Sequence, residues 1–138
     1  MKTKKIKSPT HAQLKRELDK LWIECIKARA LYKSELSGKE GRKIGGDIIL
    51  TSHHIVGKPN NYLRYLLDNG ICLENGNEHI FGVHNKNDVI RARYYQDLII
   101  QKIGQEKYNQ LLSFRKKAPT VDLRLIKIYL QQKLEELT

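Results

Sequence analysis

The sequence predicts an α+β fold that is mostly helical and has one small antiparallel hairpin at its centre. Apolar residues recur at helical spacing near both ends of the chain, over residues 10–32 and 87–138. Strand-favouring residues gather in two short runs near the middle, 47–56 and 71–73. At 138 residues the chain is long enough for one hydrophobic core but not for two independent ones. We therefore expect a single domain over residues 1–138.

The first helix is predicted from a capping signal and a long apolar stripe. Thr10 with Gln13 three residues later matches a capping box, in which side chain and backbone bond reciprocally at a helix start. We expect this helix to continue to about Tyr32. Its apolar positions are Leu14, Leu18, Leu21, Trp22, Cys25 and Ile26. Residues 1–8 form a basic tail that we expect to be flexible until it meets phosphate.

The middle of the chain predicts a hairpin between irregular segments. Residues 33–46, here called the knuckle, combine glycines, serines and charges in a way typical of turns. A first strand is expected within 47–56, and residues 62–67 favour a helical turn or an ordered loop. The turn signal Asp68-Asn69-Gly70 leads into a second strand, 71–73, which we expect to pair antiparallel with the first.

Helical patterns resume after the hairpin. Residues 78–83 can form a short helix. The next helix can be capped by Asn87 or Asp88 and runs to Ile103, with Gly104 in the position of a C-terminal cap.

Two more helices are predicted towards the C-terminus. Residues 105–117 favour one helix, which Pro119 ends. Thr120 is predicted to cap the last one. The inward stripe of this last helix is Leu123, Ile126, Leu130, Leu134 and Leu137. We expect the helices to pack around the hairpin.

The charge balance limits the kinds of partner and compartment. The chain has 26 Lys and Arg against 15 Asp and Glu, a formal charge of +11, which favours nucleic acid first and an acidic membrane surface second. No apolar run approaches the roughly 20 residues that cross a bilayer, and the basic start lacks the apolar core of a signal peptide. We expect a cytoplasmic protein, in a host's cytoplasm if a phage encodes it, with no membrane partner. Cys25 and Cys72 are most simply small buried hydrophobes.

Four of the five histidines lie between residues 53 and 84. Imidazole is a good ligand for divalent ions, and a catalytic site leaves coordination positions open for water and substrate. Adjacent residues on a regular strand point to opposite faces, so His53 and His54 cannot both bind one ion. One can bind while the other takes a proton. His79 can complete the site with His53, whereas His84 joins it only if the helix is irregular. Each histidine alone is more simply a polar loop residue or a satisfied structural one.

The order of these residues resembles the HNH endonuclease family, especially its small phage-type members. The resemblance is carried by residues 53–55, 63–73 and 79–84, which contain a pair of histidines, an asparagine and a late histidine. It implies a ββα-metal finger over residues 47–84, in which a hairpin and a helix hold one catalytic divalent ion. The helices over 87–138 then flank this core.

The resemblance also implies a role for each matching residue. His53 and His79 correspond to metal ligands, His84 to an additional ligand, and His54 to the general base. Asn69 is similar to the family's middle asparagine, which fixes the loop that bears the base. The implied activity is metal-dependent hydrolysis of DNA phosphodiester bonds, leaving a 5′-phosphate and a 3′-hydroxyl. The implied cofactor is one divalent ion, first Mg²⁺, with Mn²⁺, Ni²⁺ or Zn²⁺ as alternatives.

The chain departs from many family members in one respect. Those relatives hold a structural zinc with two pairs of cysteines, whereas the corresponding segments here contain Ser34 and Ser37 in the knuckle and residues 74–78 after the second strand. Serine hydroxyls are poor zinc ligands. We therefore expect no structural zinc, and a knuckle that is held by packing and hydrogen bonds.

Basic residues near the histidines are the candidate DNA contacts. Lys58 and Arg64 follow the paired histidines, and Arg91 and Arg93 follow His84. Arg64 can instead support its own loop through an ion pair with Asp68.

Three functional classes remain open from the sequence. The leading one is an HNH-type DNA endonuclease, and the alternative is a weakened or inactive nucleic-acid-binding protein with the same fold. A third is a structural metal protein that does not bind nucleic acid, which the charge disfavours. Both a monomer and a homodimer are compatible with the sequence.

Overall fold

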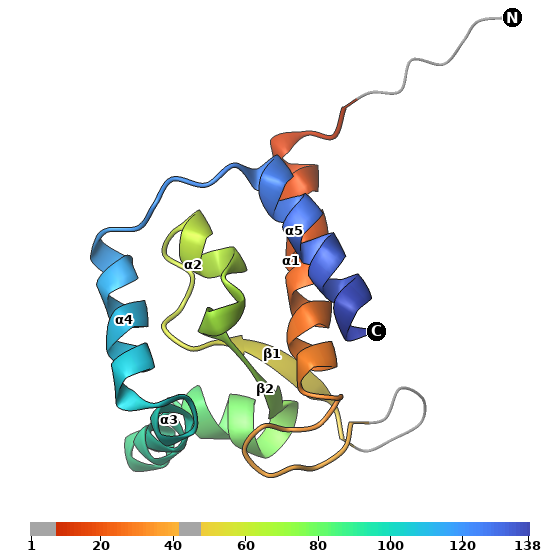
Figure 1. The fold of residues 1–138 in the computed structure, drawn as a ribbon. Coiled ribbons are helices and arrows are strands. Elements are labelled where there is room, and N and C mark those ends of the chain that lie inside the picture. Colours follow the sequence, from red (N-terminus) through yellow and green to blue (C-terminus); the bar gives the residue numbers. More distant parts are fainter. Residues whose placement is uncertain (1–7, 42–47) are drawn as a thin grey trace, which may run out of the picture.

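The computed structural model describes residues 8–41 and 48–138 and has an α+β fold (Figure 1). A two-stranded antiparallel sheet lies among helices, as the sequence predicts. In chain order the elements are α1 (His11–Arg29), β1 (Leu50–His54), α2 (Asn61–Tyr65), the short 3-10 helix η1 (Leu67–Asn69), β2 (Gly70–Glu74), the π-helix η2 (Asn75–Val83), α3 (Val89–Ile103), α4 (Gln105–Lys116) and α5 (Leu123–Leu137). The expectations for residues 1–7 and 42–47, including most of the tail and the end of the knuckle, lie outside the described residues.

Helix α1 begins where the capping box predicts. The Thr10 N–H donates to Gln13 Oε1 at 2.8 Å, and the Gln13 N–H donates to Thr10 Oγ1 at 3.1 Å. The helix ends at Arg29 rather than near Tyr32. Leu31 and Tyr32 have φ angles of 55° and 56°, which lie in the left-handed region and end the right-handed helix.

The hairpin forms from the two predicted runs with changed limits. Strands β1 and β2 pair antiparallel, and His54 lies opposite Gly70. Strand β1 is shorter than the predicted run, because the N–H groups of Ile55 and Val56 both bond to Asn69 and leave the ladder. Strand β2 is longer than predicted and includes Gly70 at its start.

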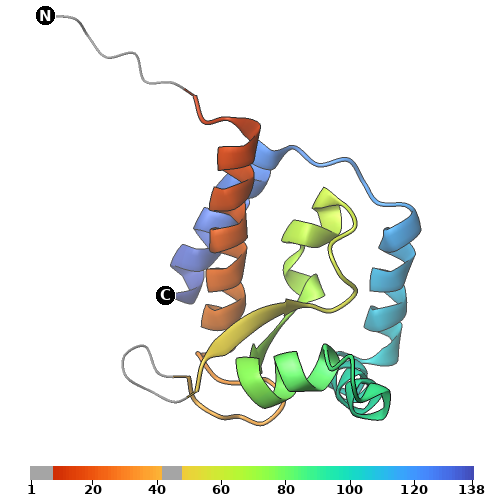
Figure 2. The same cartoon turned by 180° about the vertical axis from the view of Figure 1, so that it is seen from behind.

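The buried apolar residues form two clusters, one on each face of the hairpin. The first joins α1 and α5 to the sheet and includes Leu18, Trp22, Cys25, Ile26, Leu50, Cys72 and Leu130. The second joins α2, α3 and α4 to the sheet and includes Leu63, Ile71, Leu73, Ile99 and Leu111. Both cysteines are buried and unpaired, as predicted. Seen from both sides, α2 lies between α4 and the α1–α5 pair (Figures 1 and 2).

The junction of α3 and α4 follows its local signals. Asp88 caps α3 by accepting the Arg91 N–H at 2.9 Å, and Gly104 separates the two helices with a φ of 94°. Among the helices in the described ranges, none is both long and apolar enough to cross a bilayer.

The predicted start of the last helix is wrong by two residues. Asp122 rather than Thr120 caps α5, because its carboxylate accepts the Arg124 N–H at 2.9 Å. Leu123 and Leu130 are buried as predicted, but Leu137 is 37% exposed. Leu137 therefore adds little to the core, whereas Leu134 packs against it.

We expect Leu130→Ala to destabilise the protein by about 2–5 kcal/mol, because it leaves a cavity where α1 and α5 pack together. Leu125→Ala on the same helix is the matched control. Leu125 is 64% exposed, so its truncation should change the free energy of unfolding by no more than about 0.5 kcal/mol. Urea denaturation of both variants measures the difference. Equal effects would contradict the packing described here.

Candidate active site

Three histidines meet on one face of the hairpin. His53 of β1 is 7% exposed and lies opposite Ile71. Its ring centroid is 5.2 Å from that of His79 and 5.0 Å from that of His84, and the His79 and His84 centroids are 4.5 Å apart. One ligand atom from each ring lies within 4.8 Å of the others. In the described part of the chain, this is the one group of His, Cys, Asp or Glu side chains close enough to hold a metal ion.

The π-helix η2 explains how His84 joins the cluster. In an α-helix residues five apart do not share a face, which is why the sequence left His84 uncertain. Instead, the His84 N–H donates to the His79 carbonyl at 3.0 Å, the five-residue hydrogen bond of a π-helix. The wider turn brings residues five apart near to one face. The expected short helix 78–83 is thus longer and of a different type.

His79 is oriented by a neighbour on the same helix. Its Nδ1 lies 3.2 Å from the Asn75 Oδ1. Because an amide oxygen can only accept, Nδ1 carries the proton and Nε2 keeps its lone pair. A hydrogen bond of this kind is the usual support for a histidine that binds a metal ion.

His54 lies on the opposite face of the hairpin, against α1. Its ring stacks on Trp22 with a centroid distance of 3.9 Å and an interplanar angle of 3°. Its Nε2 lies 2.9 Å from the Arg64 carbonyl oxygen, which can only accept. Nε2 therefore carries the proton in the neutral ring, and Nδ1 keeps a lone pair that can accept one.

An ion pair fixes the loop that supplies this carbonyl. Arg64 donates to the two carboxylate oxygens of Asp19 on α1 at 2.8 and 2.7 Å. Burial alone would raise the pKa of Asp19, but the hydrogen bonds and charge of Arg64 lower it, so the carboxylate stays ionised. The alternative pairing of Arg64 with Asp68 is wrong, since Asp68 pairs with Lys107 at 3.2 Å.

Asn69 closes the loop between His54 and β2. It is fully buried, and its Oδ1 accepts the Val56 N–H at 3.0 Å. Its Nδ2 donates to the carbonyl oxygens of Gly57 at 2.8 Å and Leu63 at 2.9 Å. One side chain thus joins three points of the loop.

The environment keeps the central rings neutral. Burial lowers the pKa of His53 to about 3, and the nearby His79, His84 and His54 act in the same direction. Burial also lowers the pKa of His54, more than its hydrogen bond to the Arg64 carbonyl raises it. The pKa of His79 is lowered by burial and by the charge of His84. At neutral pH these rings are therefore in the form that binds metal or accepts a proton.

Hydrogen bonds hold the knuckle against the hairpin and η2. Ser34 Oγ donates to Glu78 Oε1 at 2.6 Å and accepts the Leu36 and Ser37 N–H groups, both at 3.1 Å. Glu78 is only 5% exposed, and its Oε1 also accepts the Glu74 N–H at 2.7 Å. The expected hydrogen-bonded support of the knuckle is thus present, and it ends one residue before His79.

The four residues predicted to contact DNA differ in whether their side chains already have partners within the protein. Lys58 and Arg93 are exposed, whereas Arg64 is held by the Asp19 pair. The exposed Arg91 donates to the Phe81 carbonyl at 2.9 Å and lies over the Tyr95 ring at 5.3 Å. Two of the four predicted cations therefore also have structural partners.

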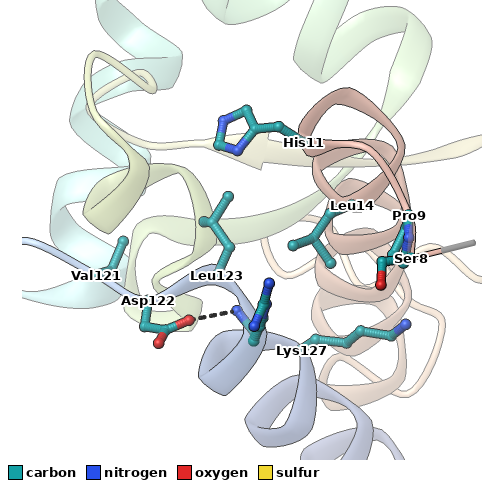
Figure 3. A pocket seen from close by; sticks show the side chains of 9 residues that line it. Ser8, Pro9, His11, Leu14, Val121, Asp122, Leu123 and Lys127 are labelled. Carbon is teal, nitrogen blue, oxygen red and sulfur yellow. Dashed lines mark hydrogen bonds between the residues drawn. The ribbon is translucent and has the colours of Figure 1, made fainter.

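The fifth histidine lies apart from this site. His11 lines a hollow of about 620 Å³ between the starts of α1 and α5 (Figure 3). The side chains around it include Leu14, Leu123 and Lys127, and Lys127 pairs with Glu17 at 2.8 Å. His11 is consequently a useful control for variants of the other four.

Sequence reasoning missed the side chains of α1 that support His54. It assigned Trp22 to the core and gave Asp19 no role. The two residues are three apart and so share a helix face, with a carboxylate beside an indole. That pairing is the one local signal that could have suggested a polar contact on this face.

We expect Ser34→Ala to cost about 1–3 kcal/mol, because it removes one of the two hydrogen bonds to the buried Glu78 Oε1 and takes the acceptor away from two backbone N–H groups. Ser37→Ala is the matched control, since Ser37 is exposed and its Oγ accepts only the Lys39 N–H, at 3.4 Å. Chemical denaturation compares the two. A control as costly as Ser34→Ala would show that the Glu78 contact is not the cause.

We expect the metal-free protein to lose stability as the pH falls from about 6.5 towards 3. The pKa of His53 is about 3 when folded, against an ordinary value of 6.5, so in this window only the unfolded state takes up its proton. This residue should lower the free energy of unfolding by up to about 1.4 kcal/mol per pH unit. Urea unfolding in EDTA across this range measures the slope. His53→Asn should flatten it and His11→Asn should not, and the reverse result would refute the assignment.

No protein-family model, curated protein or solved structure matches this chain. Its function is therefore inferred from its residues and their geometry. The most distinctive feature is a pair of adjacent histidines, of which one lies among ring partners and the other against α1.

Proposed function

We propose that this protein is a metal-dependent DNA endonuclease of the HNH type. The observation that supports it best is that the adjacent His53 and His54 lie on opposite faces of β1, in different surroundings. His53 lies in a cluster of three imidazoles, and the hydrogen bond between His54 Nε2 and the Arg64 carbonyl leaves the Nδ1 lone pair of His54 able to accept a proton. Catalysed phosphodiester hydrolysis uses both a cation site and a base.

The three imidazoles fit a divalent ion. His53, His79 and His84 would hold it, and three nitrogen donors without a carboxylate favour Zn²⁺ or Ni²⁺ over Mg²⁺ and Mn²⁺, which prefer oxygen. Three protein ligands leave positions for water and a phosphate oxygen. When bound, such an ion supplies charge neutralisation at the reacting phosphate and at the departing oxygen.

His54 would act on the attacking water. Its Nδ1 takes a proton from water while Nε2 stays hydrogen-bonded to the Arg64 carbonyl. Stacking on Trp22 and the Asp19–Arg64 pair prevent the ring from turning.

The charge of the chain supports DNA as the substrate. The formal charge is +11, and the exposed Lys58 follows His54 after a turn in which the Gly57 N–H donates to the His54 carbonyl at 3.3 Å. Phosphate contacts from such cations provide affinity without sequence preference. Arg93 on α3 would add a second contact beyond His84.

We expect the purified protein to nick or linearise supercoiled plasmid when Zn²⁺, Ni²⁺, Mn²⁺ or Mg²⁺ is present, and to stop in EDTA. His54→Ala should lower the rate by about 10²- to 10⁴-fold, because it removes the base, while DNA binding and metal binding persist. His53→Ala should lose cleavage together with the rise in melting temperature that metal causes. His11→Ala should behave like the parent protein.

The other outcomes point to the other functions. Binding of DNA without cleavage under any metal would favour the binding-only protein with the same fold. Metal-dependent stabilisation with weak, salt-insensitive DNA binding would favour a structural metal protein. Cleavage that survives His54→Ala would refute the assigned base.

A further inference from the structure

The end of α4 carries a cluster of cations without acidic partners. Arg115, Lys116 and Lys117 are consecutive and all exposed. Residues 107–121 contain no Asp or Glu, and neither do residues 48–67 on the facing loop. Among the described residues, the ion pairs involve none of these three cations and not Lys58.

Tertiary contacts bring this cluster of cations close to the loop that follows β1. The Asn60 Nδ2 donates to the Phe114 carbonyl at 2.9 Å, one residue before Arg115. The Tyr62 and Phe114 rings meet edge to face with centroids 4.8 Å apart. The exposed Lys58 is two residues before Asn60. It therefore lies on the same loop that binds the end of α4 through Asn60.

A hollow separates the two segments. It has a volume of about 420 Å³ and is lined on one side by residues 59–62 and on the other by Arg115, Lys116 and residues 118–121. Both walls are free of carboxylates, and Arg115 and Lys116 make one of them positive. Its first lining residue, Pro59, comes five residues after His54 and directly after Lys58.

We propose that this hollow binds the DNA strand that flanks the cleaved bond. The strand would pass from His54 and Lys58 into the hollow, where Arg115 and Lys116 bind its phosphates. The identification of DNA rests on the proposed function, whereas the binding surface rests on charge and shape.

The salt dependence of DNA binding tests this surface. Each phosphate contact on duplex DNA contributes about 0.9 to the slope of log K against log salt. In EDTA, Arg115→Gln/Lys116→Gln should lower that slope by about 1.8. The control Arg16→Gln/Lys20→Gln removes the same charge from an exposed face of α1 and should leave the slope nearly unchanged. Equal slopes for both variants would overturn the proposal.

Site-directed cross-linking gives a second measurement that does not depend on the double variant folding. The chain has two cysteines, both buried, so Thr120→Cys provides one accessible thiol in the wall of the hollow. A photoreactive label there should cross-link to a DNA strand, and one at the exposed Gln132→Cys on α5 should not. Absence of cross-linking at Thr120→Cys, or equal cross-linking at both positions, would refute the path. Both measurements use binding without metal, so a failure of cleavage leaves them interpretable.

Discussion

The contact between Trp22 and the end of the hairpin determines much of this structure. The indole stacks on His54, donates from Nε1 to the Leu66 carbonyl at 3.1 Å and approaches Gly70 of β2. A Cβ at Gly70 would lie 2.7 Å from the Trp22 Cζ2, so this approach requires a glycine. The packing of α1 on the sheet and the orientation of the proposed base are therefore one interaction.

The hairpin places His53 and His54 in two different environments, because neighbouring side chains on a strand point to opposite faces. His53 faces the cluster with His79 and His84, while His54 faces α1. Each ring is lowered in pKa chiefly by burial in its own environment. A strand end, with a π-helix on one face and an α-helix on the other, is enough to give adjacent residues different environments.

Local signals in the sequence predicted the parts of the fold that depend on local bonding. The Thr10 capping box and Gly104 are short-range features and are found as predicted, whereas the choice of Asp122 over Thr120 shows that two good caps close together cannot be ranked from sequence. The Arg64–Asp19 pair joins residues 45 apart and was not predictable from spacing. The sequence grouped the right histidines, but only the π-helix shows how His84 joins them.

The π-helix also determines how many residues can separate His79 and His84 while their rings lie on one face. Residues five apart in η2 share a face, as residues four apart do in an α-helix. A chain with one residue fewer between the two histidines would present the same pair of rings from an ordinary α-helix. The spacing of the two histidines in the sequence is therefore matched to the type of helix that carries them.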